Sequence, residues 1–266
     1  TWNFEKIAGT YKGATVGVAW HGNAIYFTTV VEGQILRMEG GSSAPVEYRR
    51  YMRRITGIGF APDGDFFACQ EGSRRIVQFM NDGSTRTTAS FFDGKIHNYP
   101  NDLCVDAKGR VWFADAYHPV PSLGIYRPPL EHASVLRLER DHNKAWRLVR
   151  VTEDTDAPRA VLLSADEKTL YLSHGEAAGK AHCELRAYPV RGDGSVGDYR
   201  SLVTFGIDDA GTHRGIEGMC LDSEGNIVAV CGSKAAGPGP HAIVIAPSGA
   251  VIESHPLPFD MPMRCA

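Results

Sequence analysis

One pattern constrains the fold of this chain more than any other feature of its sequence: a pair of short apolar strands that recurs along it. Each copy consists of an apolar strand, a polar turn rich in Asp, Gly and Lys, and a second apolar strand, which is typical of a β-hairpin. The copies lie at residues 17–29, 57–69, 101–115, 159–173 and 217–230. Measured at the last apolar residue of the first strand, successive copies are 40, 45, 58 and 58 residues apart. A third strand and a more polar fourth strand follow each hairpin, so the repeat predicts the four-stranded blades of a β-propeller.

The repeat extends over the whole chain and predicts one all-β domain over residues 1–266. A four-stranded blade buries too little apolar surface alone and is stabilised by stacking on its neighbours around an axis. No segment has the sustained 3.6-residue apolar period of an amphipathic helix. The extra length of the third and fourth copies falls in Pro- and Gly-rich segments at 116–132 and 174–183. We expect these segments to be loops that cover one end of the propeller axis.

The two ends of the chain predict a sixth, incomplete blade. Residues 261–266 resemble the first strand of a blade, with Cys265 lying 44 residues after Leu221. Residues 2–8 could supply the outer strand of that blade, while its two middle strands have no counterpart in the sequence. A ring with such a gap would expose strand edges to aggregation. We therefore expect a six-bladed propeller of four-stranded antiparallel blades, in a native chain that continues past Ala266.

Charge and composition exclude several kinds of partner. The net charge of −3 leaves no basic excess with which to bind nucleic acid. No stretch approaches the roughly 18 apolar residues of a membrane-spanning helix. The six cysteines form no CxxC pair and no short disulfide framework, which indicates buried thiols in a reducing, cytoplasmic compartment. We expect a monomer or weak dimer whose partner is a small, oxygen-rich organic molecule.

Four stretches of the sequence resemble the regucalcin/gluconolactonase family of six-bladed propellers. They lie at residues 42–79, 97–115, 163–173 and 213–230. The most specific of them contain "PNDLCVDAKGRVWFAD" and "GMCLDSEGN". The resemblance implies the propeller fold, one divalent cation at its axis, and hydrolysis of lactones of sugar acids or related small esters.

The resemblance also identifies the metal-ligand positions, and most of them are altered in this chain. The family holds its cation, such as calcium, zinc or magnesium, with a Glu that opens the first blade, an Asn that opens the fourth and an Asp that opens the fifth. The corresponding residues here are Val16, Arg159 and Glu217, and only Asn101 of the third-blade "PND" motif is kept. Two of the three positions, those of Val16 and Arg159, therefore carry side chains that cannot coordinate a metal ion. If a metal is retained, Glu217 and Asn101 are the residues expected to hold it.

The substitution at position 159 has a physical explanation. Without a metal, a buried Glu217 would be an unpaired anion, at a cost of several kcal/mol. The guanidinium of Arg159 can offset that charge, so we expect Arg159 to replace the cation and to pair with Glu217. In the alternative, the strand register differs, Arg159 points to the rim of the propeller, and another acid such as Glu71 completes a metal site.

Three functions remain open. The first is a hydrolase that opens a lactone or similar ester, with Glu217 as the base and Arg159 and Asn101 stabilising the oxyanion. The second is a non-hydrolytic enzyme, an isomerase, cyclase or lyase, that uses the same groups. The third is a noncatalytic propeller that binds a small ligand. Other side chains expected to contact the substrate are Tyr99, His97, His118, Glu71 and His213. Each of these histidines has a plainer alternative as a structural residue of a loop.

Overall fold

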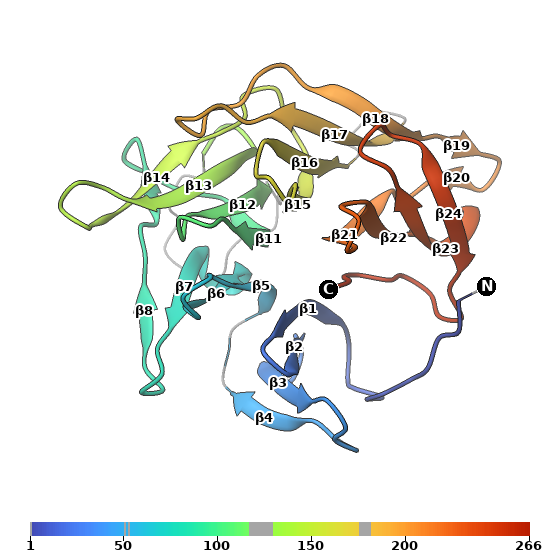
Figure 1. Ribbon diagram of the computed structural model, residues 1–266, viewed down its shortest axis with the longest axis horizontal. Helices are drawn as coiled ribbons and strands as arrows, with labels where there is room; N and C mark the ends of the chain where they lie inside the picture. Colours follow the sequence, from blue (N-terminus) through green and yellow to red (C-terminus); the bar gives the residue numbers. More distant parts are fainter. Residues whose placement is uncertain (1, 51, 53, 117–129, 176–181) are drawn as a thin grey trace.

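The blades predicted from the repeat are present, and there are five of them. The computed structural model describes residues 2–50, 52, 54–116, 130–175 and 182–266. Within these residues, five four-stranded antiparallel sheets surround a common axis (Figure 1). The all-β propeller of four-stranded antiparallel blades is therefore confirmed. The predicted count of six blades is wrong for the part of the chain that is described.

In every blade the strands follow the chain order from the axis to the rim. The first blade contains β1 (Thr15–His21), β2 (Ala24–Thr29), β3 (Gln34–Glu39) and β4 (Val46–Arg49). The second contains β5 (Ile55–Phe60), β6 (Phe66–Gln70), β7 (Arg75–Phe79) and β8 (Thr85–Thr87). The third contains β11 (Tyr99–Val105), β12 (Val111–Ala116), β13 (Ser134–Arg140) and β14 (Trp146–Arg150). The fourth contains β15 (Pro158–Leu163), β16 (Thr169–His174), β17 (Cys183–Pro189) and β18 (Arg200–Phe205). The fifth contains β21 (Ile216–Leu221), β22 (Ile227–Ser233), β23 (Ala236–Ile245) and β24 (Val251–Pro256).

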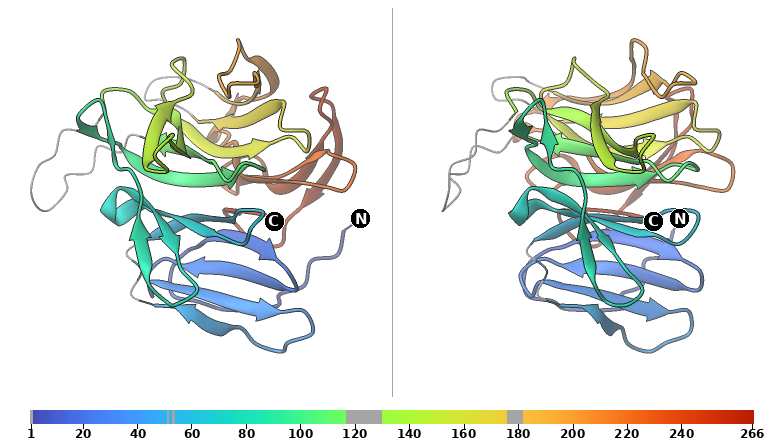
Figure 2. Two further views of the ribbon diagram at one scale, coloured as in Figure 1. Left: turned by 60° about the vertical axis from the view of Figure 1, so that its left-hand side comes forward. Right: turned by 90° about the vertical axis from the view of Figure 1, so that its left-hand side faces the viewer.

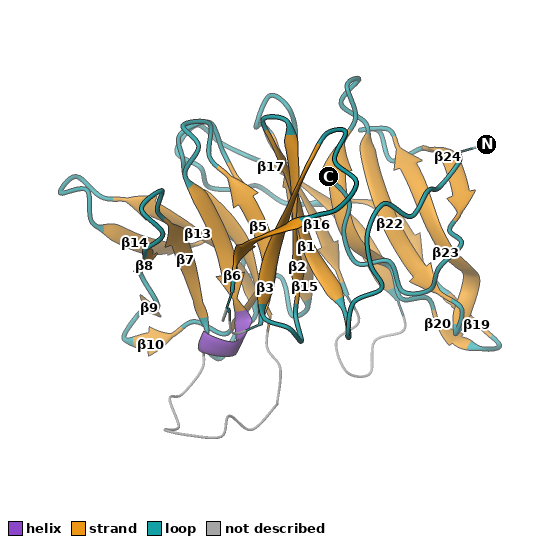
Figure 3. Cartoon of the chain, turned by 90° about the horizontal axis from the view of Figure 1, so that it is seen from below, coloured by secondary structure: helices purple, strands orange, loops and turns teal. Residues whose placement is uncertain are grey.

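Shorter elements connect the blades at one end of the propeller. They are the 3-10 helix η1 (Glu71–Ser73) and two small hairpins, β9 (Phe91–Phe92) with β10 (Lys95–Ile96) and β19 (Ile207–Asp208) with β20 (Gly211–Thr212). Figure 3 shows all of them at the same end. The loops predicted at 116–132 and 174–183 lie largely outside the described residues. The described part of the chain contains no helix with the length and apolar character that crossing a bilayer requires.

The apolar core lies between consecutive blades, which pack face to face (Figure 2). Side chains alternate between the two faces of a strand. In β12, Phe113 accordingly packs with Phe67 of the second blade, whereas its neighbour Trp112 packs with Leu172 of the fourth. Trp112 and Phe113 are 1% and 0% exposed. Each middle strand thus contributes to two layers of core, which explains why these strands read as nearly continuous apolar runs.

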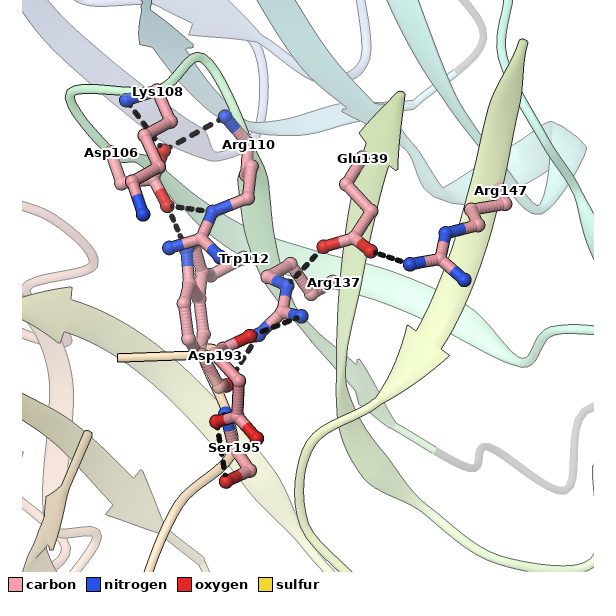
Figure 4. A network of polar contacts seen from close by, with 10 residues as sticks. Asp106, Lys108, Arg110, Trp112, Arg137, Glu139, Arg147, Asp193 and Ser195 are labelled. Atoms are coloured by element: carbon pink, nitrogen blue, oxygen red, sulfur yellow. Dashed lines mark hydrogen bonds and ion pairs between the residues drawn. The ribbon is translucent and has the colours of Figure 1, made fainter. Parts of the chain in front are cut away.

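The repeated Asp in the hairpin turns has a structural role (Figure 4). Oδ1 of Asp106 accepts the amides of Lys108 and Arg110 at 3.0 and 2.9 Å. Oδ2 of Asp106 accepts Nε of Arg110 at 2.6 Å and Nε1 of Trp112 at 2.9 Å. Asp222 binds the amides of its own turn in the same way. The carboxylate therefore closes the turn and fixes the first two strands of the blade relative to one another.

The N-terminal segment does not form the predicted outer strand. Residues 2–14 run without strand structure along the opening between the first and fifth blades (Figure 1). The ring of Trp2 stacks on His255 of β24, with ring centroids 4.4 Å apart. The prediction for residues 2–8 fails because this segment packs through its aromatic side chain and makes no ladder of backbone hydrogen bonds with β24.

The C-terminal segment lies where a sixth inner strand would lie. A Cβ added to Gly17 of β1 would lie 2.0 Å from a backbone oxygen of β5, and one added to Gly57 of β5 would lie 2.7 Å from Cα of Asp102 in β11. One added to Gly218 of β21 would lie 2.5 Å from Cα of Arg264. Arg264 thus approaches β21 as each inner strand approaches the one before it. The predicted position of residues 261–266 is confirmed, but the segment forms no strand.

Candidate active site

A β-bulge near the first residue of each inner strand builds the axial site. The register shifts lie between Thr15 and Val18, Ile55 and Ile58, Pro100 and Asp102, Pro158 and Ala160, and Ile216 and Gly218. A bulged residue is left out of the ladder and its side chain is redirected. The bulged residues include Val16, Asn101, Arg159 and Glu217. One backbone device therefore presents all four positions that the family comparison of the sequence selected.

Arg159 and Glu217 form the predicted ion pair across two blades. Nη1 of Arg159 lies 2.8 Å from Oε1 of Glu217 and donates to the carbonyl of Arg214 at 2.6 Å. Nε of Arg214 donates to the same Oε1 at 2.7 Å. The Glu217 side chain is 8% exposed, whereas those of Arg159 and Arg214 are 29% and 26% exposed. The alternative register, with Arg159 at the rim, is not observed.

Several polar atoms of this cluster remain available for a ligand. Among the described residues, the structure gives no hydrogen-bond partner for Oε2 of Glu217, Nη2 of Arg159 or Nη1 of Arg214. Both guanidiniums bind Oε1 of Glu217. Oε2 is therefore held in position while its capacity to accept hydrogen bonds is kept. The cluster therefore combines a fixed hydrogen-bond acceptor with hydrogen-bond donors from two neighbouring side chains.

Asn101 lies next to this cluster on the third blade. Its Nδ2 donates to the carbonyl of Arg159 at 3.3 Å. Its own carbonyl accepts Nη2 of Arg264 at 3.3 Å. The structure thus brings together Asn101, Arg159 and Glu217, the three residues predicted to act on the substrate.

Arg264 closes the cluster from the C-terminal segment. Its Nε lies 3.1 Å from Oδ1 of Asp102, and its Nη1 donates to the backbone carbonyls of Glu217 and Met263. The Arg264 and Asp102 side chains are 6% and 10% exposed. Burial raises the pKa of the Asp102 carboxyl, and the charge of Arg264 opposes that shift. Because the guanidinium of Arg264 is buried, it presents no hydrogen-bond donors to a ligand, and its role is to link β21 to β11 across the axis.

Reasoning from the sequence missed Arg214 and Arg264. A signal for Arg214 exists in the stretch "HRGIEGM", where the arginine stands three residues before Glu217. Arg264 gives no such local signal, because its partners Asp102 and Glu217 lie 162 and 47 residues away along the chain.

The other predicted contact residues are engaged by groups outside the cluster or lie outside the described residues. The guanidinium of Arg74 lies over the ring of Tyr99, 5.2 Å from its centroid. Glu71 lies in η1 and pairs with Arg54 at 2.9 Å, so the alternative in which Glu71 completes a metal site gains no support. His118 lies outside the described residues.

Both described histidines of that set have structural partners. Nδ1 of His97 lies 2.9 Å from Oδ1 of Asp115, and both side chains are fully buried. Nδ1 of His213 accepts the amide of Gly215 at 2.9 Å, and its ring stacks on Phe205. Burial lowers the pKa of His213, and the nearby His241 lowers it further. A neutral His213 therefore braces the turn that leads into β21.

The residues at the axis do not fit a divalent cation. Such an ion takes several oxygen ligands, often carboxylates. Val16 offers no ligand atom, and a guanidinium nitrogen of Arg159 lies 2.8 Å from Glu217, where a cation would have to bind. The described residues contain no group of three or more His, Cys, Asp or Glu side chains placed to hold a metal. The charge at this position is supplied by arginine.

A hollow of about 370 Å³ lies between the third and fourth blades. The turns that line it join the first strand to the second and the third to the fourth, so it lies at the opposite end of the propeller from the axial cluster. Its charged side chains are engaged with each other: Arg110 pairs with Asp106, and Glu139 with Arg137 and Arg147 (Figure 4). This network joins two blades and leaves the axial cluster as the better candidate site.

Comparison with known proteins identifies relatives over nearly the whole chain. The family model described as the SMP-30/Gluconolactonase/LRE-like region matches residues 15–266. A search of curated proteins found no match. Among solved structures, a gluconolactonase from Xanthomonas campestris is 25% identical, with a TM-score of 0.77, over 95% of this chain and 78% of that one. A luciferin-regenerating enzyme is 17% identical, with a TM-score of 0.69, over 94% of this chain and 78% of that one. A calcium-binding regucalcin from Agrobacterium tumefaciens is 12% identical, with a TM-score of 0.70, over 94% and 76% of the two chains.

Proposed function

The chain belongs to the SMP-30/gluconolactonase/LRE-like family, and we propose that it is a hydrolase that opens a lactone or similar ester of a small, oxygen-rich molecule. The similarity to the Xanthomonas gluconolactonase supports a lactonase-type activity. The observation that carries the proposal is the carboxylate of Glu217, with Oε1 held by Arg159 and Arg214 and Oε2 left without a partner in the described part of the chain.

Glu217 acts as the general base in this proposal. Two guanidiniums fix its carboxylate through Oε1, so Oε2 faces the site in one orientation. Oε2 takes a proton from a water molecule whose oxygen attacks the lactone carbonyl carbon. The carbonyl π bond breaks as the new C–O bond forms, and the negative charge collects on the carbonyl oxygen.

Arg159 and Asn101 stabilise that oxyanion. The Nη2 group of Arg159 supplies a charge-assisted hydrogen bond, and the side-chain amide of Asn101, which donates to the backbone carbonyl of Arg159, supplies a second hydrogen bond. When the oxyanion collapses, the ring C–O bond breaks and the proton held by Glu217 passes to the leaving oxygen. One lactone and one water thus give one hydroxy acid, which releases its carboxyl proton to solvent and leaves the site as its carboxylate, and Glu217 returns to its starting state.

A lactone panel with a chelator tests this proposal. The purified protein would be assayed on five- and six-membered aldonolactones and an aryl ester, with excess chelator, while acid release is followed. We expect turnover that the chelator does not change, and a fall in kcat of about 100-fold or more in Glu217→Gln. Glu224→Gln, an exposed acid on the far turn of the same blade, is the matched control and should match the wild type.

Three results would contradict the proposal. Turnover that depends on added divalent cation would mean that a metal, and not Arg159, polarises the carbonyl. The absence of turnover on every lactone and ester, combined with a melting temperature raised by a small organic acid, would favour a noncatalytic binding propeller. Conversion of a lactone to an isomer without acid release would favour a non-hydrolytic enzyme.

A further inference from the structure

The charges at the axial cluster do not balance. Arg264 is matched by Asp102, 3.1 Å away. Arg159 and Arg214, in contrast, share a single carboxylate, that of Glu217. Counted over the described side chains, two guanidiniums against one carboxylate leave one excess positive charge at the site. Because these side chains are about three-quarters buried, water and salt screen that charge less than they would at the surface.

No described acid offsets the excess. Asp156, three residues before Arg159, is engaged by His174, with Nε2 and Oδ1 2.7 Å apart. Glu71 is engaged by Arg54. Within the described ranges, no carboxylate other than Glu217 is placed within ion-pair distance of Arg159 or Arg214.

The two arginines are also held in position before any ligand arrives. Nη1 of Arg159 is fixed by the carbonyl of Arg214 at 2.6 Å, and Nη2 of Arg214 lies 3.6 Å from Sδ of Met263. A Cβ on Gly175 would lie 2.2 Å from Nε of Arg159, so the missing side chain at Gly175 leaves the room that the guanidinium occupies. Both guanidiniums converge on one oxygen of Glu217 and keep donors, Nη2 of Arg159 and Nη1 of Arg214, that have no partner among the residues the structure describes. A carboxylate can accept charge-assisted hydrogen bonds from such preorganised donors.

We propose that the axial site selects lactones that carry a free carboxylate, that is, monolactones of sugar diacids, with Arg214 as the specificity-determining residue. This inference rests on the proposed function of the same site. The substrate carboxylate binds Nη1 of Arg214 and offsets the excess charge. The lactone carbonyl lies at Nη2 of Arg159 and faces Oε2 of Glu217. Neutral aldonolactones leave the excess charge unmatched and bind less tightly.

The test compares two lactones that differ in one group. Glucono-1,4-lactone is neutral, and glucaro-1,4-lactone has the same five-membered ring with a carboxylate in place of the C6 hydroxymethyl group. We expect kcat/KM to be about 10-fold or more higher for the carboxylate-bearing lactone, and Arg214→Gln to remove that preference. Arg214→Lys keeps the charge without the fork and should retain part of the preference. Arg86→Gln, an exposed arginine on β8, is the control that should leave it unchanged. Thermal melting of each variant verifies that it is folded.

A binding measurement separates failure of this inference from failure of the proposed function. Calorimetry with glucarate and gluconate, a dianion and a monoanion, requires no turnover. Glucarate binding that is tighter than gluconate binding and is lost in Arg214→Gln supports the inference even where neither lactone is hydrolysed, in which case only the hydrolase proposal fails. Equal kcat/KM for the two lactones in the wild type, or a preference that persists in Arg214→Gln, overturns the inference while leaving the hydrolase proposal intact.

Discussion

Nη1 of Arg159 lies 2.8 Å from Oε1 of Glu217, and both residues occupy the bulged position of neighbouring inner strands. In the regucalcin/gluconolactonase family these two positions are expected to carry metal ligands. Here the guanidinium of Arg159 lies beside Glu217, where a cation would have to bind. A guanidinium brings one positive charge and several N–H donors in a fixed planar arrangement. Its effect on the site therefore depends on the geometry of these donors as well as on its charge.

Replacement of Arg159 by lysine should therefore impair the site although the charge is kept. Lysine is a point charge without the fork that reaches Glu217, the carbonyl of Arg214 and a ligand together. We expect kcat/KM on the best lactone to fall by about 10- to 100-fold, equivalent to the loss of one charge-assisted hydrogen bond. Steady-state kinetics give the result, with melting temperature as the measure of folding. A fully active Arg159→Lys protein would mean that charge alone suffices.

Restoring ligand atoms should restore cation binding. The double variant Val16→Glu, Arg159→Asn removes the guanidinium and adds oxygen ligands around Glu217. We expect calcium to bind the double variant, measured by calorimetry, and the wild type to give no binding heat at the same concentrations. Val16→Ala with Arg159→Asn is the control, because it removes the guanidinium without adding a carboxylate. Stoichiometric calcium on the wild-type protein would contradict the replacement of the metal by Arg159.

Removal of Arg264 should destabilise the fold. Arg264→Met leaves the buried Asp102 carboxylate unpaired, at a cost of about 3 to 5 kcal/mol in the free energy of unfolding. Arg200→Met is the matched control, since Arg200 is exposed and also binds two carbonyls of the next blade. Urea unfolding measures both. The double variant Arg264→Met, Asp102→Asn should recover part of the loss, and an unchanged loss in that double variant would show that the unpaired charge is not its cause.

The same pair gives a pH dependence with a defined sign. Burial raises the pKa of Asp102 in the folded state. A raised carboxyl pKa means that the folded state holds the proton more tightly than the unfolded state does. The protonated Asp102 therefore contributes to the free energy of unfolding at low pH, and this contribution is lost as pH rises through the folded pKa. Without Arg264 to oppose the effect, the loss with rising pH should be larger in Arg264→Met than in the wild type. Urea unfolding between about pH 4 and pH 8 measures the difference.

His213 should add a pH dependence of the opposite sign. Its folded pKa is lowered, first by burial, so the unfolded chain takes up the proton before the folded chain does. The stability from neutral His213 is present above its ordinary pKa of about 6.5 and is lost as pH falls toward the folded value. The fall in unfolding free energy over this range should be smaller in His213→Gln than in the wild type. His142→Gln, an exposed histidine, should leave the wild-type slope unchanged, whereas equal slopes in all three proteins would contradict the role of His213.

Most of the propeller could be predicted because its hairpins are local. A turn such as that closed by Asp106 is specified by a few adjacent residues, and the alternation of Trp112 and Phe113 reports two buried faces directly. The number of blades, in contrast, is not specified by adjacent residues. It depends on how the last inner segment packs on Gly218 and on whether residues 2–8 pair with β24, and neither contact has a signature in the sequence.

The site was predictable only in part, for the same reason. The pairing of Arg159 with Glu217 follows from their places in equivalent repeats. The approach of Arg214 to Glu217 requires the turn at Gly215, which has a φ of 74° and brings the arginine back over the bulge. The partners of Arg264 come from two different blades and depend on the closed ring.

The bulge in each inner strand also affects how this scaffold can change. A bulged residue makes little contribution to the ladder, so its side chain can be exchanged without loss of the hydrogen bonds that hold the blade together. The axial residues Val16, Asn101, Arg159 and Glu217 occupy this position in four different blades. Exchange of one of these side chains therefore leaves the ladders of the blades intact, whereas a change at Arg159 alone leaves the buried carboxylate of Glu217 without this cation.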